Sequence, residues 1–178
     1  EKKLCAIRNL EGEMVEFDPK ALWEFEPAAD YYGAPKNHPY ERSDLAKLLS
    51  ILNTLCVVFI DTRLYLGGAH LEGANLENVQ LRWADLQGAH LEKASLTTSN
   101  LEGATLWEAH LEEAQLRIAN LKGADLRNAH LKNANFESAN LERAQLDWAD
   151  FEGAELPNAI LKKTQLTGAK LERANLTM

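Results

Sequence analysis

The chain has 178 residues, of which 46% are hydrophobic and 26% charged, and its formal net charge is −8. Residues 1–65 contribute −3 of this charge and residues 66–178 contribute −5. Neither part is basic enough to bind a phosphate backbone through counterion release, so direct nucleic-acid binding is not expected. Most of the apolar residues are Leu and Ala, a composition that indicates a repeat rather than a core of mixed shapes.

The two cysteines, Cys5 and Cys56, lack the spacing of a metal-binding or redox pair. We therefore expect a reduced, cytoplasmic protein. Because the chain begins with Glu1, we also expect a processed or trimmed product, from which a targeting or anchoring segment could have been removed. The longest apolar stretch, residues 45–60, is interrupted by polar side chains and is too short to span a bilayer comfortably.

Residues 1–65 form a non-repeat region. Ser43 and Asp44 can cap a helix over residues 44–57, whose leucines fall on one face. We expect this helix, within an otherwise irregular region, to cover the N-terminal end of the repeats that follow. An uncovered end would present an unpaired edge and bare leucines.

Residues 66–178 repeat with a period of five. Leucine recurs at every fifth position from Leu71 to Leu176, replaced only by Phe136 and Phe151, and a small residue, usually Ala, stands two positions before each. These are 22 consecutive pentapeptides, a period that fits neither a helix nor a strand. We expect the Leu and Ala side chains to point inward and the other three positions to face solvent, with a corner in every repeat.

A longer period of 20 residues is also present. The fragments GAHLEGA, GAHLEKA, EAHLEEA and NAHLKNA begin at residues 68, 88, 108 and 128. Four edges of five residues would close one square coil of this length, and successive coils would stack at the strand spacing of about 4.8 Å. Each coil would satisfy the backbone groups of its neighbours.

The tandem A(D/N)LXX pattern resembles that of the pentapeptide repeat family, over about 113 of the 178 residues. The resemblance implies an all-β solenoid, a right-handed quadrilateral parallel β-helix, here with about 5.5 coils. Such proteins are abundant in cyanobacteria and other bacteria, and many have no assigned biochemical role. Family members often dimerise end to end, so the resemblance also implies a homodimer through the C-terminal coil.

A histidine recurs at 20-residue spacing, and a glutamate follows three of these histidines two residues later: His70, His90, His110 and His130, with Glu72, Glu92 and Glu112. Imidazole and carboxylate groups stacked on one face could ligate Zn²⁺ or another transition metal. They could instead respond to pH, because neighbouring imidazolium charges would repel one another below about pH 6. The simplest explanation is duplication of the sequence of one coil, which repeats its outward residues together with its inward ones. No cofactor is expected.

Three tryptophans, Trp83, Trp107 and Trp148, occupy outward positions of the repeat. The coil register places Trp107 and Trp148 on one face and Trp83 at its near corner. Exposed aromatic side chains are typical anchors of protein interfaces, which makes these three the candidate interaction residues. The alternative is that the rings lie flat over neighbouring side chains and only cover the surface.

The sequence offers little to a catalytic mechanism. The Ser and Thr hydroxyls lie far from any oriented histidine, no Gly-rich phosphate loop follows a strand, and the outward carboxylates should be solvated, with unshifted pKa values. We therefore predict a protein that is not an enzyme, without catalytic residues. Its predicted role is a rigid interaction scaffold for an unknown protein partner.

Two alternatives stay open. One is a DNA mimic that binds DNA gyrase, which the resemblance implies because one branch of the family acts in this way. The net negative charge of the chain permits this function. Basic residues such as Arg117, Lys122 and Arg127 interrupt the acidic surface and argue against this alternative. The other alternative is a metal-binding or pH-responsive module built on the four spaced histidines.

Overall fold

The computed structural model describes residues 5–8, 14–17 and 66–177. The chain divides into two compact units, Glu1–Asn37 and His38–Met178. The predicted helix over residues 44–57 and its capping role lie outside the described residues. The predicted division between residues 65 and 66 stays a prediction.

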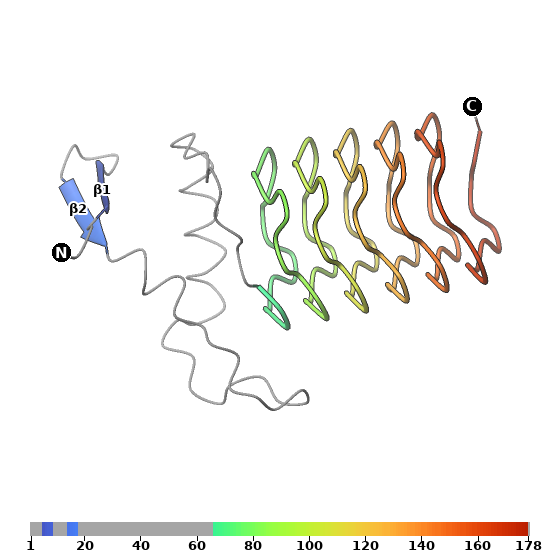
Figure 1. The fold of residues 1–178 in the computed structure, drawn as a ribbon, viewed down its shortest axis with the longest axis horizontal. Coiled ribbons are helices and arrows are strands. Elements are labelled where there is room, and N and C mark those ends of the chain that lie inside the picture. The colour runs from blue at the N-terminus through green and yellow to red at the C-terminus, as the bar shows by residue number, and fades with distance from the viewer. Residues whose placement is uncertain (1–4, 9–13, 18–65, 178) are drawn as a thin grey trace. The chain divides into compact units, whose positions relative to one another are not determined.

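Two short strands lie in the first unit. β1 (Cys5–Arg8) and β2 (Met14–Phe17) pair in an antiparallel sheet, with Ile7 opposite Val15 (Figure 1). Both of these residues are β-branched and favour an extended backbone. Only helical and irregular structure is expected from the sequence before residue 66, and this sheet corrects that expectation. The available signal was two short apolar runs separated by a segment that contains Gly12.

Residues 66–177 form stacked coils, seen from green to red in Figure 1. Parallel bridges join residues that are 20 positions apart, from His70 with His90 to Glu155 with Asn175. The 20-residue coil predicted from the sequence is therefore present. Because side chains at this spacing occupy the same place in successive coils, every outward position forms a column along the stack.

Each repeat from Leu66 to Leu171 contains a tight turn. The N–H of the residue three positions after the Leu donates to the Leu carbonyl, as from Ala104 to Leu101 at 3.0 Å. The residue before the donor has a positive φ, as at Gly103 with φ 67°. A positive φ at the third residue identifies a type II turn, in which Gly or Asn is preferred there. The chain therefore turns a corner every five residues, and four corners complete a coil.

Many of these positive-φ positions carry residues other than Gly, including Trp83, Ile118 and Trp148. An L-residue in this region of φ costs roughly 1–2 kcal/mol, and a bulky or β-branched one is unusual. The neighbouring coils hold these turns in place. Lys93, for example, donates its N–H to Glu112 of the next coil at 2.9 Å.

The core is a column of leucines and alanines, most of them fully buried from Leu71 to Ala154. Phe136 and Phe151 replace leucine within it and contact each other, with ring centroids 5.6 Å apart. Ser99 is a polar residue at one of these inward positions, and its buried hydroxyl has no hydrogen-bond partner. The inward placement predicted for the Leu and Ala positions is confirmed for these repeats.

The inward positions of the last described coil are more exposed. Leu161, Leu166 and Leu171 are only partly buried, and Leu176 is 41% exposed. Ile160, at an outward position, is 51% exposed. Within the described residues, no helix has the length and apolar character that crossing a membrane requires.

Candidate functional site: the histidine ladder and the tryptophan groove

The four spaced histidines lie in one column on successive coils. From His70 to His130 their imidazole rings are stacked, with centroids 4.6, 4.7 and 4.6 Å apart and interplanar angles of 12°, 1° and 9°. We call His70, His90, His110 and His130 the histidine ladder. The rings stack as the spacing predicts, whereas metal binding by them stays a prediction.

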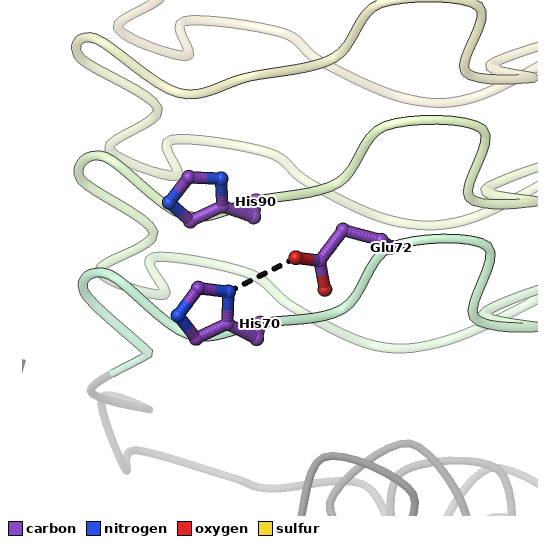
Figure 2. A group of neighbouring side chains, drawn as sticks. All are labelled: His70, Glu72 and His90. Carbon is purple, nitrogen blue, oxygen red and sulfur yellow. Dashed lines mark hydrogen bonds and ion pairs between the residues drawn. The ribbon is translucent and has the colours of Figure 1, made fainter.

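Glutamates of the same coils face the first two imidazoles. Oε1 of Glu72 lies 3.0 Å from Nδ1 of His70 (Figure 2). Oε1 of Glu92 lies 3.2 Å from Nδ1 of His90. Both pairs are about one third exposed, so they lie at the surface without being fully solvated. The Nδ1 edge of the ladder therefore faces a column of carboxylates.

Glu112 is placed differently. Its Oε1 lies 3.9 Å from Nδ1 of His110 and 4.0 Å from Nδ1 of His130 in the following coil. Both distances exceed hydrogen-bonding range. Lys132 stands where a fourth glutamate would continue the column. Glu112 therefore lies between two imidazole nitrogens without a hydrogen bond to either.

The second carboxylate oxygens of Glu92 and Glu112 are buried and have no hydrogen-bond partner. Such an oxygen is costly to leave unsatisfied, so its neighbourhood suggests a missing donor or cation. The ladder contains three sets of potential metal ligands, each with its ligand atoms within 4.8 Å of one another: His70, Glu72 and His90; His90, Glu92 and His110; His110, Glu112 and His130.

Beyond His130 the ladder column continues with Asp150 and then Lys170. Partial burial raises the pKa of the Asp150 carboxyl. This effect of burial is smaller than the combined effect of hydrogen bonds from the Glu152 N–H and the Lys170 ammonium and of the Lys132 charge. The pKa of Asp150 is therefore below its ordinary value. A hydrogen bond from Lys132 at 2.9 Å also lowers the pKa of Glu152.

The expectation of unshifted carboxylates was therefore wrong for Asp150 and Glu152. A second example is Asp125, where partial burial raises the pKa but two side-chain hydrogen bonds from Arg127, at 2.8 and 2.7 Å, leave it lowered. The coil register brings acidic and basic columns together, and outward side chains cover one another's polar atoms. The positive charge of Arg127 is therefore already paired with the Asp125 carboxylate at the protein surface.

Two of the tryptophans lie over glycines of the next coil. The ring of Trp83 occupies the space that a Cβ on Gly103 would need, and the ring of Trp148 does the same at Gly168. Trp83 remains 58% exposed and Trp148 64% exposed. The two rings therefore cover backbone of the next coil and still present most of their surface to solvent.

Trp107 and Trp148 line one surface groove of about 720 Å³, which we call the tryptophan groove. Its remaining lining residues are polar: Arg127, Asn128, Asp147, Gln165 and Thr167. The structure brings together the two tryptophans that the register placed on one face, and Trp83 is outside this groove. Sequence reasoning did not name these polar residues. The available signal was the coil register, which places Arg127, Asp147 and Thr167 in the column of Trp107.

A second, smaller groove of about 460 Å³ links Trp148 to the end of the ladder. His110, His130, Asp150 and Lys170 contribute to its lining. The ladder and the tryptophan groove therefore occupy neighbouring parts of the surface, with Trp148 lining both depressions.

Stacked 20-residue coils with four turns each define a four-sided parallel β-solenoid. The family model for pentapeptide repeats matches residues 65–103, 94–133, 119–156 and 139–177, in eight copies. The chain belongs to the pentapeptide repeat family, which confirms the resemblance drawn from the sequence. Membership implies the right-handed quadrilateral β-helix, and proteins of this family are generally structural or interaction proteins.

Several solved structures are similar to this chain. Rfr23, a pentapeptide repeat protein from the cyanobacterium Cyanothece 51142, is 34% identical over 55% of this chain, with a TM-score of 0.37. The matched region covers 64% of Rfr23. A pentapeptide repeat protein of the Arabidopsis thaliana thylakoid lumen is 23% identical, over 70% of this chain and 75% of that one, with a TM-score of 0.46.

A trypsin-treated variant of QnrB1, a plasmid-mediated fluoroquinolone resistance protein, is 23% identical over 61% of this chain and 58% of that one, with a TM-score of 0.36. No protein with curated functional information matches the sequence.

Proposed function

We propose that this chain is a non-enzymatic, rigid scaffold that binds a protein partner through the tryptophan groove. The observation that carries the proposal is the pairing of Trp107 with the 64% exposed Trp148 in one groove. Large aromatic anchors beside a polar rim are the usual composition of a protein interface.

Rigidity supports the proposal. The Trp148 backbone N–H donates to Thr167 of the next coil at 2.8 Å, and the ring lies over Gly168. The backbone turn is therefore held in place before a partner arrives, and less conformational entropy is lost on binding. The Asp147 carboxylate accepts a hydrogen bond from the Thr167 N–H at 2.8 Å, which holds the polar lining of the groove in the same way.

The test is a cross-linked pull-down from cells of the source organism. We expect the parent chain to capture a specific partner, and the Trp107→Ala, Trp148→Ala double variant to lose it. Trp83→Ala is the matched control, because Trp83 is similarly exposed and lies over a glycine but is outside the groove. Equal capture by the parent and the double variant would contradict the groove as the binding surface.

The gyrase-binding DNA mimic remains the alternative, and the charge distribution disfavours it. Basic side chains pair with acids one coil away, as Arg117 does with Glu137 at 2.9 Å and Lys122 with Glu142 at 3.7 Å. A DNA mimic needs an extended run of uncompensated negative charge instead. Inhibition of purified gyrase supercoiling by the chain would favour the mimic, and unchanged supercoiling would exclude it.

Two further expectations belong to this proposal and stay predictions. One is a cytoplasmic location, although one similar structure comes from a thylakoid lumen. The other is a homodimer through the C-terminal coil, whose Leu166 and Leu171 are partly exposed. A second copy stacked on this coil would cover them.

A further inference from the structure

We propose that the histidine ladder binds two zinc ions, one held by His70, Glu72 and His90 and the other by His110, Glu112 and His130. Each set combines two imidazoles with one carboxylate, which is a common zinc ligand set. This site is separate from the tryptophan groove and does not depend on the proposed scaffold function.

Distances at the second set support the proposal. Oε1 of Glu112 is 3.9 and 4.0 Å from the two imidazole nitrogens, and no two ligand atoms of the set are more than 4.8 Å apart. A point equidistant from three atoms at these separations lies about 2.5 Å or less from each, whereas zinc bonds to nitrogen and oxygen are about 2.0–2.2 Å long. The separations of the ligand atoms are therefore within a few tenths of an ångström of those that zinc requires.

The stacked rings must also turn, because their lone pairs now lie in parallel planes and do not converge on one point. The side chains of His110 and His130 are 34% and 49% exposed, so this rotation displaces solvent rather than packed core. Their backbones stay bridged between coils. Metal binding therefore requires changes in side-chain torsions and leaves the coil unchanged.

The buried, unpartnered Oε2 atoms provide a second argument. Oε2 of Glu112 belongs to a proposed ligand, and zinc would compensate its unsatisfied charge. Glu92 stands in the coil between those of Glu72 and Glu112, so its negative charge would reduce the repulsion between the two proposed ions. The ions would be about 9 Å apart, two coil spacings, at which salt screens much of their mutual repulsion.

Sharing of ligands sets the number of ions. The central set contains His90 and His110, each of which also belongs to one of the outer sets. Filling the central set would therefore prevent both outer sets from being complete. The maximum of two ions is reached only when the outer sets are filled and Glu92 ligates neither ion.

This arrangement gives a stoichiometry test with the full 178-residue chain, prepared without a histidine tag. After removal of metal with a chelator, the chain is dialysed against zinc chloride, and zinc per chain is measured by elemental analysis and by calorimetry. We expect two ions for the parent and for Glu92→Gln. We expect one ion for Glu72→Gln and one for Glu112→Gln, with at least about tenfold weaker binding at the altered set.

Glu152→Gln is the matched control, because Glu152 occupies the same coil position but follows Asp150 rather than a histidine. It should retain two ions. Far-UV circular dichroism checks that each variant is folded, and imidazole NMR signals of the ladder should shift when zinc is added. Fewer than two ions in the folded parent, loss of an ion in Glu92→Gln, or retention of both in Glu112→Gln would each overturn the proposal.

Discussion

The indole ring of Trp148 lies directly over Gly168 of the next coil, in the space that a Cβ on that glycine would occupy. The two residues are 20 positions apart, so the coil register brings them together. Gly168 also has a φ of 69°, which a residue with a side chain adopts at a cost. Both its backbone conformation and the Trp148 ring therefore favour glycine at this position.

Gly168→Ala should lower the free energy of unfolding by about 2 kcal/mol, half of it from the positive φ and half from displacement of the Trp148 ring. Gly123→Ala is the control, because Gly123 has a φ of 66° and open space at its Cβ position. The Gly123→Ala substitution should lower the free energy of unfolding by only about 1 kcal/mol. Urea unfolding followed by circular dichroism measures both, and equal losses would show that the ring contributes nothing.

Ile118→Gly should lower the free energy of unfolding by about 1 kcal/mol less than Ile160→Gly does. Ile118 is β-branched and has a φ of 58°, so glycine relieves backbone strain there and offsets part of the lost burial. Ile160 is similarly exposed, at 51% against 58%, but is not among the positive-φ residues. Thermal melts in which both variants lose equal stability would contradict this explanation.

Ser99→Ala should raise the free energy of unfolding by about 1 kcal/mol, because the substitution removes a buried hydroxyl without a hydrogen-bond partner. The reverse change in the next coil, Ala119→Ser, should lower it by a similar amount, since Ala119 is fully buried. Chemical denaturation of both variants checks the pair. A destabilised Ser99→Ala variant would mean that the hydroxyl has a bonding role.

Stability should fall in acid partly through Asp150. Its pKa is lower in the folded chain than in the unfolded one, so its contribution is present above about pH 4 and is lost as the pH falls through the folded value. Asp150→Asn should destabilise by about 0.5–1 kcal/mol at pH 7 and should flatten the acid side of the stability profile. Unfolding measured from pH 7 to pH 2 gives the profile, and added salt should reduce the difference.

Light scattering after size exclusion tests the predicted homodimer. If the C-terminal coil is the interface, Leu166→Glu with Leu171→Glu should convert a dimer to a monomer, because two charges would be placed where apolar side chains meet. Trp83→Ala, at a surface far along the stack, should leave the mass unchanged. A parent chain that is monomeric at all concentrations would remove the homodimer from the proposal.

Parts of the candidate site were predictable from the sequence, and parts were not. The stacking of His70 on His90 follows from their spacing, because a 20-residue coil returns every side chain to the same column. The position of Glu112 between two imidazoles does not follow, since it depends on side-chain torsions and on Lys132 replacing the next glutamate. The lowered pKa values also depend on which columns of side chains meet.

The sequence by itself determined the five-residue period, the inward Leu and Ala positions, the 20-residue coil and the family, because a strict repeat allows one way to bury the same residue types in every turn. Only the tertiary structure decided that Ile118 and Trp148 occupy strained turns, that Trp148 covers Gly168, and that Trp107 joins it in a groove. These features arise between coils, where each residue is held by neighbours 20 positions away, and local sequence preferences do not encode them.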